Sequence, residues 1–264
     1  MDISFDHYQW FFGSMLFCLI FYYFISPILS QILVDGYMAI TEEKKIMWHT
    51  MTISNVHVAV VCTLSIYVLL TDEAISKDVA WGRSFISQLP LAITLGYIVA
   101  DSIVMLHKFK FKDARSFLAH HFCTAVPYWF NITFGPLTYF AVFRLLAELS
   151  TPFVNQRYFL DVLGKKSTLG YVINGVLLTI VFFVTRIAVI PPYYREVYYV
   201  LANRSTLQLN WLYLLVWVGG SVVLDVLNVW WFRKILRGAI KTIQLHKPVK
   251  EENGDTVRNR VKGE

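Results

Sequence analysis

Charged residues are scarce in this chain. Of its 264 residues, 16% are Asp, Glu, Lys or Arg, whereas 56% are hydrophobic and the mean hydropathy is +0.50. A soluble domain is typically about 25% charged and 45–50% apolar. A soluble fold of this length cannot bury so much apolar surface, so the sequence predicts an integral membrane protein with no separate soluble domain.

Cysteine and clustered histidine are also lacking, which argues against a disulfide framework and a metal centre. The three cysteines, Cys18, Cys62 and Cys123, lie in apolar segments without CxxC spacing. They are predicted to be small buried hydrophobic residues. Di-iron lipid-modifying enzymes need many histidines in HxxxH and HxxHH clusters, and this chain offers one adjacent pair. We therefore predict no metal and no cofactor.

Basic residues are concentrated at one end of the sequence. The net charge is +6, and nine Lys or Arg residues follow from Arg233 onward. This arrangement favours a tail that contacts anionic lipid headgroups, because a nucleic-acid site would need basic residues clustered on a folded surface. Residues 246–264 lack apolar periodicity and are predicted to form a disordered cytoplasmic tail.

Seven apolar windows are long enough to cross a bilayer. The fourth and fifth are shorter and more polar, so they fit either two spans or one hairpin that dips into the membrane. Seven spans with a lumenal N-terminus place eighteen Lys or Arg on the cytoplasmic side and four on the other, in accord with the positive-inside rule. The windows are 9–31, 50–71, 86–107, 115–131, 134–156, 170–192 and 206–232.

Ionisable side chains inside these spans are the main functional candidates, because each is costly in hydrocarbon and needs a partner. His120 and His121 are adjacent and point about 100° apart on a helix. Only one of them can face a given partner squarely, and Asp101 on the preceding span could orient it. A neutral imidazole there could be a general base, a nucleophile, a metal ligand or an interhelical hydrogen-bonding group. His57 is predicted to pack between helices.

Two further pairs of polar residues share helix faces. Arg144 and Glu148 are spaced i, i+4, so we expect them to form an ion pair within one helix. Asp225 and Asn228 are spaced i, i+3 and could serve interhelical hydrogen bonding or catalysis. Arg186 lies near the lumenal end of its window and is expected to snorkel to the membrane surface.

Three segments resemble the TLC domain family, which is named after TRAM, LAG1 and CLN8. They are 96–101 (GYIVAD), 117–122 (FLAHHF) and 143–157 (FRLLAELSTPFVNQR). The resemblance covers about residues 42–245, after a first transmembrane helix within residues 1–41. It implies an all-α polytopic membrane protein of about seven transmembrane helices, with a six-helix ring around a lipid-sized cavity. It also implies an endoplasmic-reticulum protein that acts in lipid homeostasis.

Ceramide synthases share this domain and use a His pair in the corresponding span to transfer an acyl group from acyl-CoA. His120 and His121 match that pair. The chain departs from those enzymes in the next span, where Phe140, Ala141 and Arg144 stand in place of polar groups that include acids. It also lacks the homeobox-like insert of many ceramide synthases.

The expected function is therefore the binding or handling of a membrane lipid or fatty acyl chain, with His57, Arg144, Glu148, Asp225 and Asn228 in the polar network of the cavity. The alternative is an acyl-CoA-dependent acyltransferase, with His120 or His121 as base or transient acyl carrier and Asp101 or Asp225 as the assisting acid. A third possibility is a transporter or trafficking adaptor. Neither nucleic acid nor a defined oligomeric state is predicted.

Overall fold

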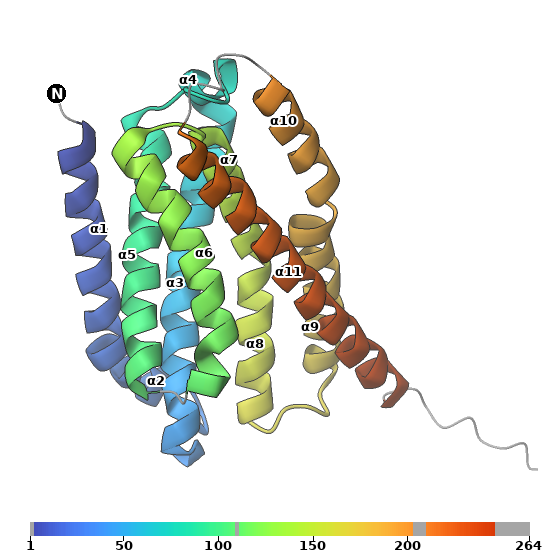
Figure 1. The fold of residues 1–264 in the computed structure, drawn as a ribbon. Helices are drawn as coiled ribbons and strands as arrows, with labels where there is room; N and C mark the ends of the chain where they lie inside the picture. Colours follow the sequence, from blue (N-terminus) through green and yellow to red (C-terminus); the bar gives the residue numbers. More distant parts are fainter. Residues whose placement is uncertain (1–2, 109–110, 203–209, 246–264) are drawn as a thin grey trace, which may run out of the picture.

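The computed structural model describes residues 3–108, 111–202 and 210–245, and the predicted disordered tail at 246–264 lies outside them. Helices make up the regular structure of these residues (Figure 1). In chain order they are α1 (Ile3–Ile20), the π-helical turn η1 (Phe21–Ile25), α2 (Ser26–Leu33), the 3-10 turn η2 (Tyr37–Ala39), α3 (Glu42–Thr71), α4 (Glu73–Lys77), α5 (Phe85–Lys108), α6 (Phe111–Phe134), α7 (Thr138–Leu145), the 3-10 turn η3 (Leu146–Ser150), α8 (Thr151–Val162), α9 (Leu169–Phe182), the π-helical turn η4 (Phe183–Ile187), α10 (Ile190–Ala202) and α11 (Trp211–Leu245).

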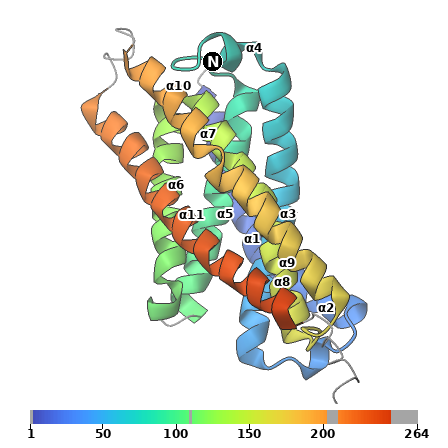
Figure 2. The same ribbon diagram turned by 90° about the vertical axis from the view of Figure 1, so that its right-hand side faces the viewer.

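Seven long rods result in the described part of the chain, because η1, η3 and η4 each join the helices on either side of them. Five rods are long and apolar enough to cross a membrane: Asp6–Leu33, Glu42–Thr71, Phe85–Lys108, Leu169–Ala202 and Trp211–Gln244. The other two, α6 and the α7–α8 rod, run the length of the bundle beside them (Figures 1 and 2). The fourth and fifth windows thus form two separate rods.

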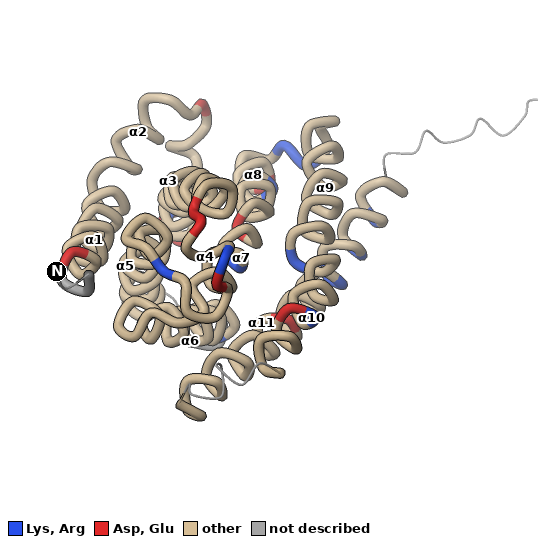
Figure 3. Tube along the Cα trace, turned by 90° about the horizontal axis from the view of Figure 1, so that it is seen from above, with Lys and Arg blue, Asp and Glu red and all other residues tan. Residues whose placement is uncertain are grey.

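Six rods form a closed ring. Going round it, α3 contacts α5, α5 contacts α6, α6 contacts α11, α11 contacts α9, α9 contacts α8, and α8 returns to α3. Viewed along the bundle in Figure 3, these helices surround a central region and α1 lies outside, next to α5. The predicted ring of six helices is confirmed, with the first rod as an additional outer helix.

Gly96 explains how the outer rod can lie so close to the ring. A Cβ at Gly96 would lie 2.3 Å from the backbone oxygen of Phe11 and 2.9 Å from the backbone nitrogen of Met15. Small residues allow such close backbone approach between helices in membranes, where packing replaces the hydrophobic driving force. The hydroxyl of Ser14 also donates a hydrogen bond to the carbonyl oxygen of Ile93, at 2.8 Å.

The two ends of the bundle differ. The start of α1, α4 and the start of α11 lie at the upper end in Figure 1, whereas α2 and the end of α11 lie at the lower end. Because the number of rods is odd, the first rod begins and the last rod ends at opposite ends of the bundle. We call the lower end the basic end, because basic residues gather in its loops and helix termini: Lys44, Lys45, Lys108, Lys165, Lys166, Arg233, Lys234, Arg237 and Lys241.

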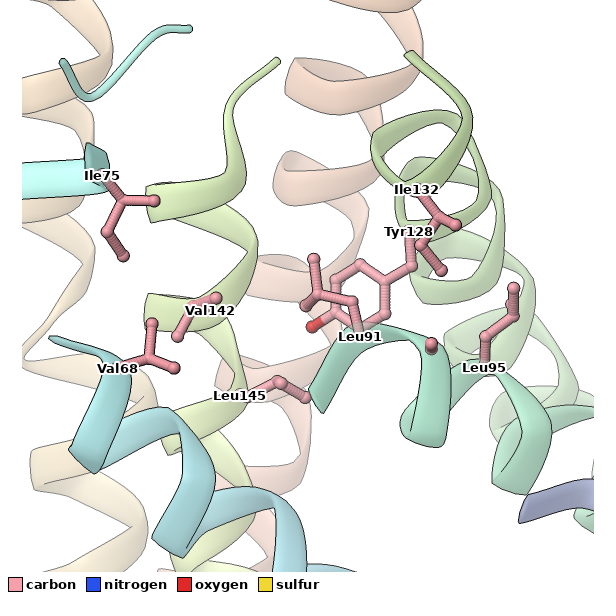
Figure 4. Close-up of a cluster of buried hydrophobic side chains, with 9 residues drawn as sticks. Val68, Ile75, Leu91, Leu95, Tyr128, Ile132, Val142 and Leu145 are labelled. Carbon is pink, nitrogen blue, oxygen red and sulfur yellow. The ribbon is translucent and has the colours of Figure 1, made fainter. Parts of the chain in front are cut away.

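An apolar core fills the ring toward the upper end (Figure 4). Leu91 and Leu95 of α5 are one helical turn apart and meet Val142 and Leu145 of α7, and all four are buried. The outer surface carries large apolar residues instead, such as Leu70, which is 79% exposed. Tyr128 and Leu145 of this core also line the central space of the ring, which continues from there toward the basic end.

Candidate functional site

A cavity of about 560 Å³ lies inside the six-helix ring, within the range of about 300–1,000 Å³ that is typical of ligand pockets. Its upper end is closed by four aromatic side chains, Phe140, Tyr193, Tyr213 and Trp217, all buried. A hydrogen bond holds two of these side chains together: the indole of Trp217 donates to the Tyr193 hydroxyl, at 3.0 Å. At the basic end the lining includes the exposed residues Asp161 and Lys234, so the cavity reaches the surface there.

Most of the ionisable residues predicted inside the spans line this cavity near the middle of its helices. His57 is about halfway along α3, and Arg186 is about halfway along the α9–α10 rod. We call the set the polar belt: it comprises the lining residues His57, Asp101, His120, His121, Arg144, Glu148, Arg186 and Asn228, and Asp225, which binds Arg144. The fold therefore brings together every site residue expected from the sequence, and adds Arg186.

His121 faces α5. Its Nδ1 lies 2.9 Å from the hydroxyl oxygen of Ser102, and its Nε2 lies 3.7 Å from Oδ2 of Asp101. The hydrogen bond to Ser102 fixes the ring, while the carboxylate stands at ion-pair distance rather than in a direct hydrogen bond. A carboxylate beside an imidazole is an arrangement that supports proton transfer.

His120 faces α11 and the cavity. Its ring packs edge-on against Trp231 of α11, with 5.6 Å between ring centroids, and lies 6.0 Å from the ring of His121. Its buried Nδ1 has no hydrogen-bond partner within the described protein. Both imidazoles line the cavity, but they differ: His121 has polar neighbours on α5, whereas the Nδ1 of His120 has no hydrogen-bond partner in the described residues.

His57 was expected to pack between helices, and it does stack on Tyr97, with 4.0 Å between ring centroids. However, it lines the cavity, and neither of its buried ring nitrogens has a hydrogen-bond partner in the described residues. Buried polar atoms of this kind are rare in folded proteins and need an explanation, such as a bound ligand or water. Packing alone is thus an incomplete account of His57.

Arg144 pairs with Asp225 of α11, and the prediction that it pairs with Glu148 is wrong. Its Nη1 and Nη2 lie 2.6 and 3.0 Å from the two carboxylate oxygens of Asp225. The guanidinium also stacks on Tyr193, 3.9 Å from the ring centroid. This bidentate ion pair is among the strongest interactions that an arginine and a carboxylate form.

Glu148 pairs with Arg186 instead, at 3.4 Å. Arg186 is buried, with 6% of its surface exposed, so the expectation that it snorkels to the surface is also wrong. Its Nε donates to the Ala147 carbonyl oxygen and its Nη1 to the side chain of Asn228, at 3.0 and 3.2 Å. The predicted interhelical hydrogen bonding of Asp225 and Asn228 is thereby observed.

Local backbone geometry explains the exchange of partners. Pro152 lacks an N–H group, so the α-helical hydrogen bond to the carbonyl of Glu148 cannot form. The N–H of Thr151 bonds to that carbonyl instead, and residues Leu146–Ser150 form a 3-10 turn. The tighter turn rotates Glu148 away from Arg144. On the other rod, Arg186 sits within the π-helical turn η4, a feature often found at functional sites.

The charges of the belt nearly cancel. Arg144 offsets Asp225, and Arg186 offsets Glu148. Asp101 is the remaining acid, and the imidazole of His121 lies beside it, 3.7 Å away. Within the described residues, no group of three or more His, Cys, Asp or Glu side chains is placed to hold a metal ion.

Sequence reasoning missed three contributors to the site. Ser102 is the direct hydrogen-bond partner of His121, Tyr97 stacks on His57, and Tyr193 stacks on Arg144. Ser102 directly follows Asp101, but a serine within a span is common and carries no signal by itself. The tyrosines were assigned no role in the site, because aromatic residues in membrane proteins are usually interfacial.

Comparison with known proteins agrees with this architecture. The TLC domain model matches residues 47–237. The chain is 38% identical to TLC domain-containing protein 4 of Homo sapiens over 233 residues, which is 88% of this chain and 89% of that protein. It is 38% identical to TLC domain-containing protein 4-B of Xenopus laevis over 83% of this chain and 84% of that protein. Human TLC domain-containing protein 1 is 24% identical over 72% of this chain and 74% of its own length. The chain belongs to the TLC domain family of polytopic membrane proteins.

Proposed function

We propose that this protein binds a membrane lipid or fatty acyl chain within its ring and thereby acts in lipid homeostasis. The observation that carries the proposal is the polar belt inside a cavity of about 560 Å³. Hydrocarbon does not tolerate such side chains unless protein, water or a ligand encloses them. A cavity of this size at membrane depth suits an amphipathic molecule.

The cavity walls have the two kinds of surface that an amphipathic ligand requires. Apolar side chains such as Ile98, Leu178 and Leu224 line it alongside the belt. Ligand sites usually combine a mostly apolar lining with a few placed polar groups that fix orientation. An acyl chain can lie on the apolar walls while its polar group meets the belt.

A cavity-filling substitution tests the proposal. Ala147 lines the cavity, whereas Ala59 is exposed on the outer surface of α3. The Ala147→Phe and Ala59→Phe variants add the same side chain, one inside the ring and one outside. Lipids retained by the purified proteins are extracted and quantified by mass spectrometry. We expect retained lipid to fall in Ala147→Phe alone; equal retention in both variants, or none in the wild type, contradicts the proposal.

Acyl transfer from acyl-CoA is the second candidate, and the pair of His121 and Asp101 favours it. In such a reaction an imidazole removes a proton from an acceptor amine or hydroxyl, whose nitrogen or oxygen then attacks the thioester carbonyl. The bond from carbonyl carbon to sulfur breaks, and the thiolate of coenzyme A leaves and takes up a proton. The products are an amide or ester and free coenzyme A.

Turnover measurements distinguish this candidate. Release of coenzyme A from oleoyl-CoA by the purified wild type, lost in both His120→Ala and His121→Ala at unchanged melting temperature, supports an enzyme. The His107→Ala variant is the matched control, since His107 is exposed at the end of α5. Absence of turnover in the wild type leaves lipid binding as the function.

We also propose that the protein resides in the endoplasmic reticulum with its basic end in the cytoplasm. The positive-inside rule supports this orientation. The last turns of α11 carry the exposed residues Arg233, Arg237 and Lys241, which can contact anionic headgroups of that leaflet. The resemblance to ceramide synthases supports the choice of membrane.

A further inference from the structure

Unsatisfied polar atoms are concentrated around the cavity. In the described part of the chain, seven buried side-chain nitrogen or oxygen atoms lack a hydrogen-bond partner within the protein, and six of them belong to cavity-lining residues. The six are Nδ1 and Nε2 of His57, Oδ1 of Asp101, Nδ1 of His120, Nε of Arg144 and Nη1 of Arg157. Since folded proteins pair most buried polar atoms, this distribution indicates that a molecule in the cavity provides the missing partners.

Four of these atoms lie on neighbouring helices of the ring. His57 is on α3, Asp101 on α5 and His120 on α6, and α5 contacts both of the other helices. A neutral imidazole offers one N–H donor and one nitrogen acceptor, while a carboxyl oxygen accepts. The matching group must therefore both donate and accept hydrogen bonds, as a hydroxyl or an amide does.

Charge restricts the ligand further. Each belt arginine already has a carboxylate partner, Arg144 with Asp225 and Arg186 with Glu148. The third acid of the belt, Asp101, already has the His121 imidazole beside it, with 3.7 Å between Nε2 and Oδ2. An ionic group at the belt would thus find no free opposite charge there, and burying an unmatched charge is strongly unfavourable. The cavity-lining cations Arg157 and Lys234 are not part of the belt and lie on α8 and α11.

We infer that the polar group of the bound lipid is uncharged, carries a hydroxyl or an amide, and hydrogen-bonds to His57, Asp101 and His120 on the α3–α5–α6 side of the belt. This inference rests on the proposed function, because it names the class of lipid that the same cavity holds. It assigns His57 a role in ligand recognition.

Four ligands that share one C18 chain test the inference. Oleyl alcohol and oleamide are uncharged, oleylamine is cationic, and oleyl phosphate is anionic. Each is added to the purified, delipidated wild type in detergent, and its dissociation constant is measured by competition against a fluorescent fatty alcohol. We expect oleyl alcohol and oleamide to bind at least about tenfold more tightly than the two charged ligands, because each has two or more hydrogen bonds to the belt without an unmatched charge.

Substitutions at His57 locate the contact. His57→Phe keeps a planar ring on Tyr97 but removes both nitrogens, and it should weaken oleyl alcohol binding about tenfold. His57→Gln retains one donor and one acceptor and should restore part of that loss. His107→Phe makes the same chemical change at an exposed position of α5 and should leave binding unchanged.

The possible outcomes separate the two proposals. Binding of a charged ligand as tight as that of oleyl alcohol overturns the inference of an uncharged polar group, while the lipid-binding function stands. Unchanged binding in a folded His57→Phe variant overturns the assignment to the α3–α5–α6 side. Failure of all four ligands to bind, together with no lipid retained by the protein as purified, overturns the proposed function and the inference with it.

Discussion

Arg144 and Asp225, 81 positions apart in the sequence, form a bidentate ion pair that connects α7 to α11 inside the ring. Both side chains are largely enclosed, with 14% and 10% of their side-chain surfaces exposed. Arg186 and Glu148 form a second connection, between η4 and η3. The polar belt therefore joins the α7–α8 rod to two other rods of the ring at mid-height, in addition to lining the cavity.

Removing one partner of the first pair should destabilise the protein strongly. Asp225→Ala leaves the Arg144 guanidinium buried without its carboxylate, and the free energy of unfolding should fall by about 3–5 kcal/mol. Replacing both residues, as Arg144→Met with Asp225→Leu, should cost much less, since no unmatched charge remains. Unfolding in detergent micelles measures both.

The control for that experiment is the exposed pair of Lys77 and Glu73, at 2.5 Å and about three-quarters exposed on both sides. Glu73→Gln should change the free energy of unfolding by no more than about 0.5 kcal/mol. An Asp225→Ala variant as stable as Glu73→Gln would show that Arg144 and Asp225 do not meet inside the protein.

A double-mutant cycle should report the exchanged partners. Substituting Arg186 and Glu148 singly and together should give a coupling energy of about 1–3 kcal/mol in the free energy of unfolding, because the two side chains are in contact. The cycle for Arg144 and Glu148 should give less than about 0.5 kcal/mol, apart from weak coupling through the shared cavity. A larger coupling energy for Arg144 and Glu148 than for Arg186 and Glu148 would contradict the exchange of partners and support the intrahelical pair that the spacing predicts.

These two pairs also mark the limit of what the sequence can predict. Composition and the length of the apolar windows determine that the chain spans the membrane, and the cost of charge in hydrocarbon determines which residues turn inward. Both predictions depend only on local sequence. The inward position of His120, Asp101 and Asp225 follows from the second of them, whereas the ring of six helices was implied only by the resemblance to the TLC domain family.

Partner choice depends instead on how each helix is rotated, and departures from α-helical geometry alter that rotation. The i, i+4 spacing of Arg144 and Glu148 has meaning only in a continuous α-helix, and the 3-10 turn before Pro152 removes that condition. Arg186 was misjudged because its depth was estimated from the edge of an apolar window, although the rod continues through η4 into α10. The proline was visible in the sequence and could have warned of the first error.

Gly96 should be intolerant of even a methyl group. In Gly96→Ala the new Cβ would collide with the backbone of α1 rather than with a movable side chain, so α1 and α5 must separate. We expect a loss of about 1–3 kcal/mol in the free energy of unfolding. Gly13→Ala, on α1 with nothing within 4 Å of the new methyl group, is the control and should be neutral or slightly stabilising. Equal effects of the two substitutions would contradict the close contact between α1 and α5.

The orientation of the bundle can be tested with epitope tags. A tag inserted after Lys166, in the loop between α8 and α9, should be reached by antibody once the plasma membrane alone is permeabilised. A tag inserted after Asp78, beyond α4 at the opposite end, should be reached only after internal membranes are also opened. Both tags on the same side would contradict a ring of full-length spans, and the reverse pattern would invert the proposed orientation.

Direct imaging of the purified protein in lipid nanodiscs by cryo-electron microscopy is the most decisive test of the central claim, that the ring encloses a lipid. We predict elongated density along the apolar walls of the cavity, ending beside His57, Asp101 and His120, with the imidazoles of α6 turned inward. A ring that has collapsed onto itself, or one whose histidines face the surrounding acyl chains, would contradict the account.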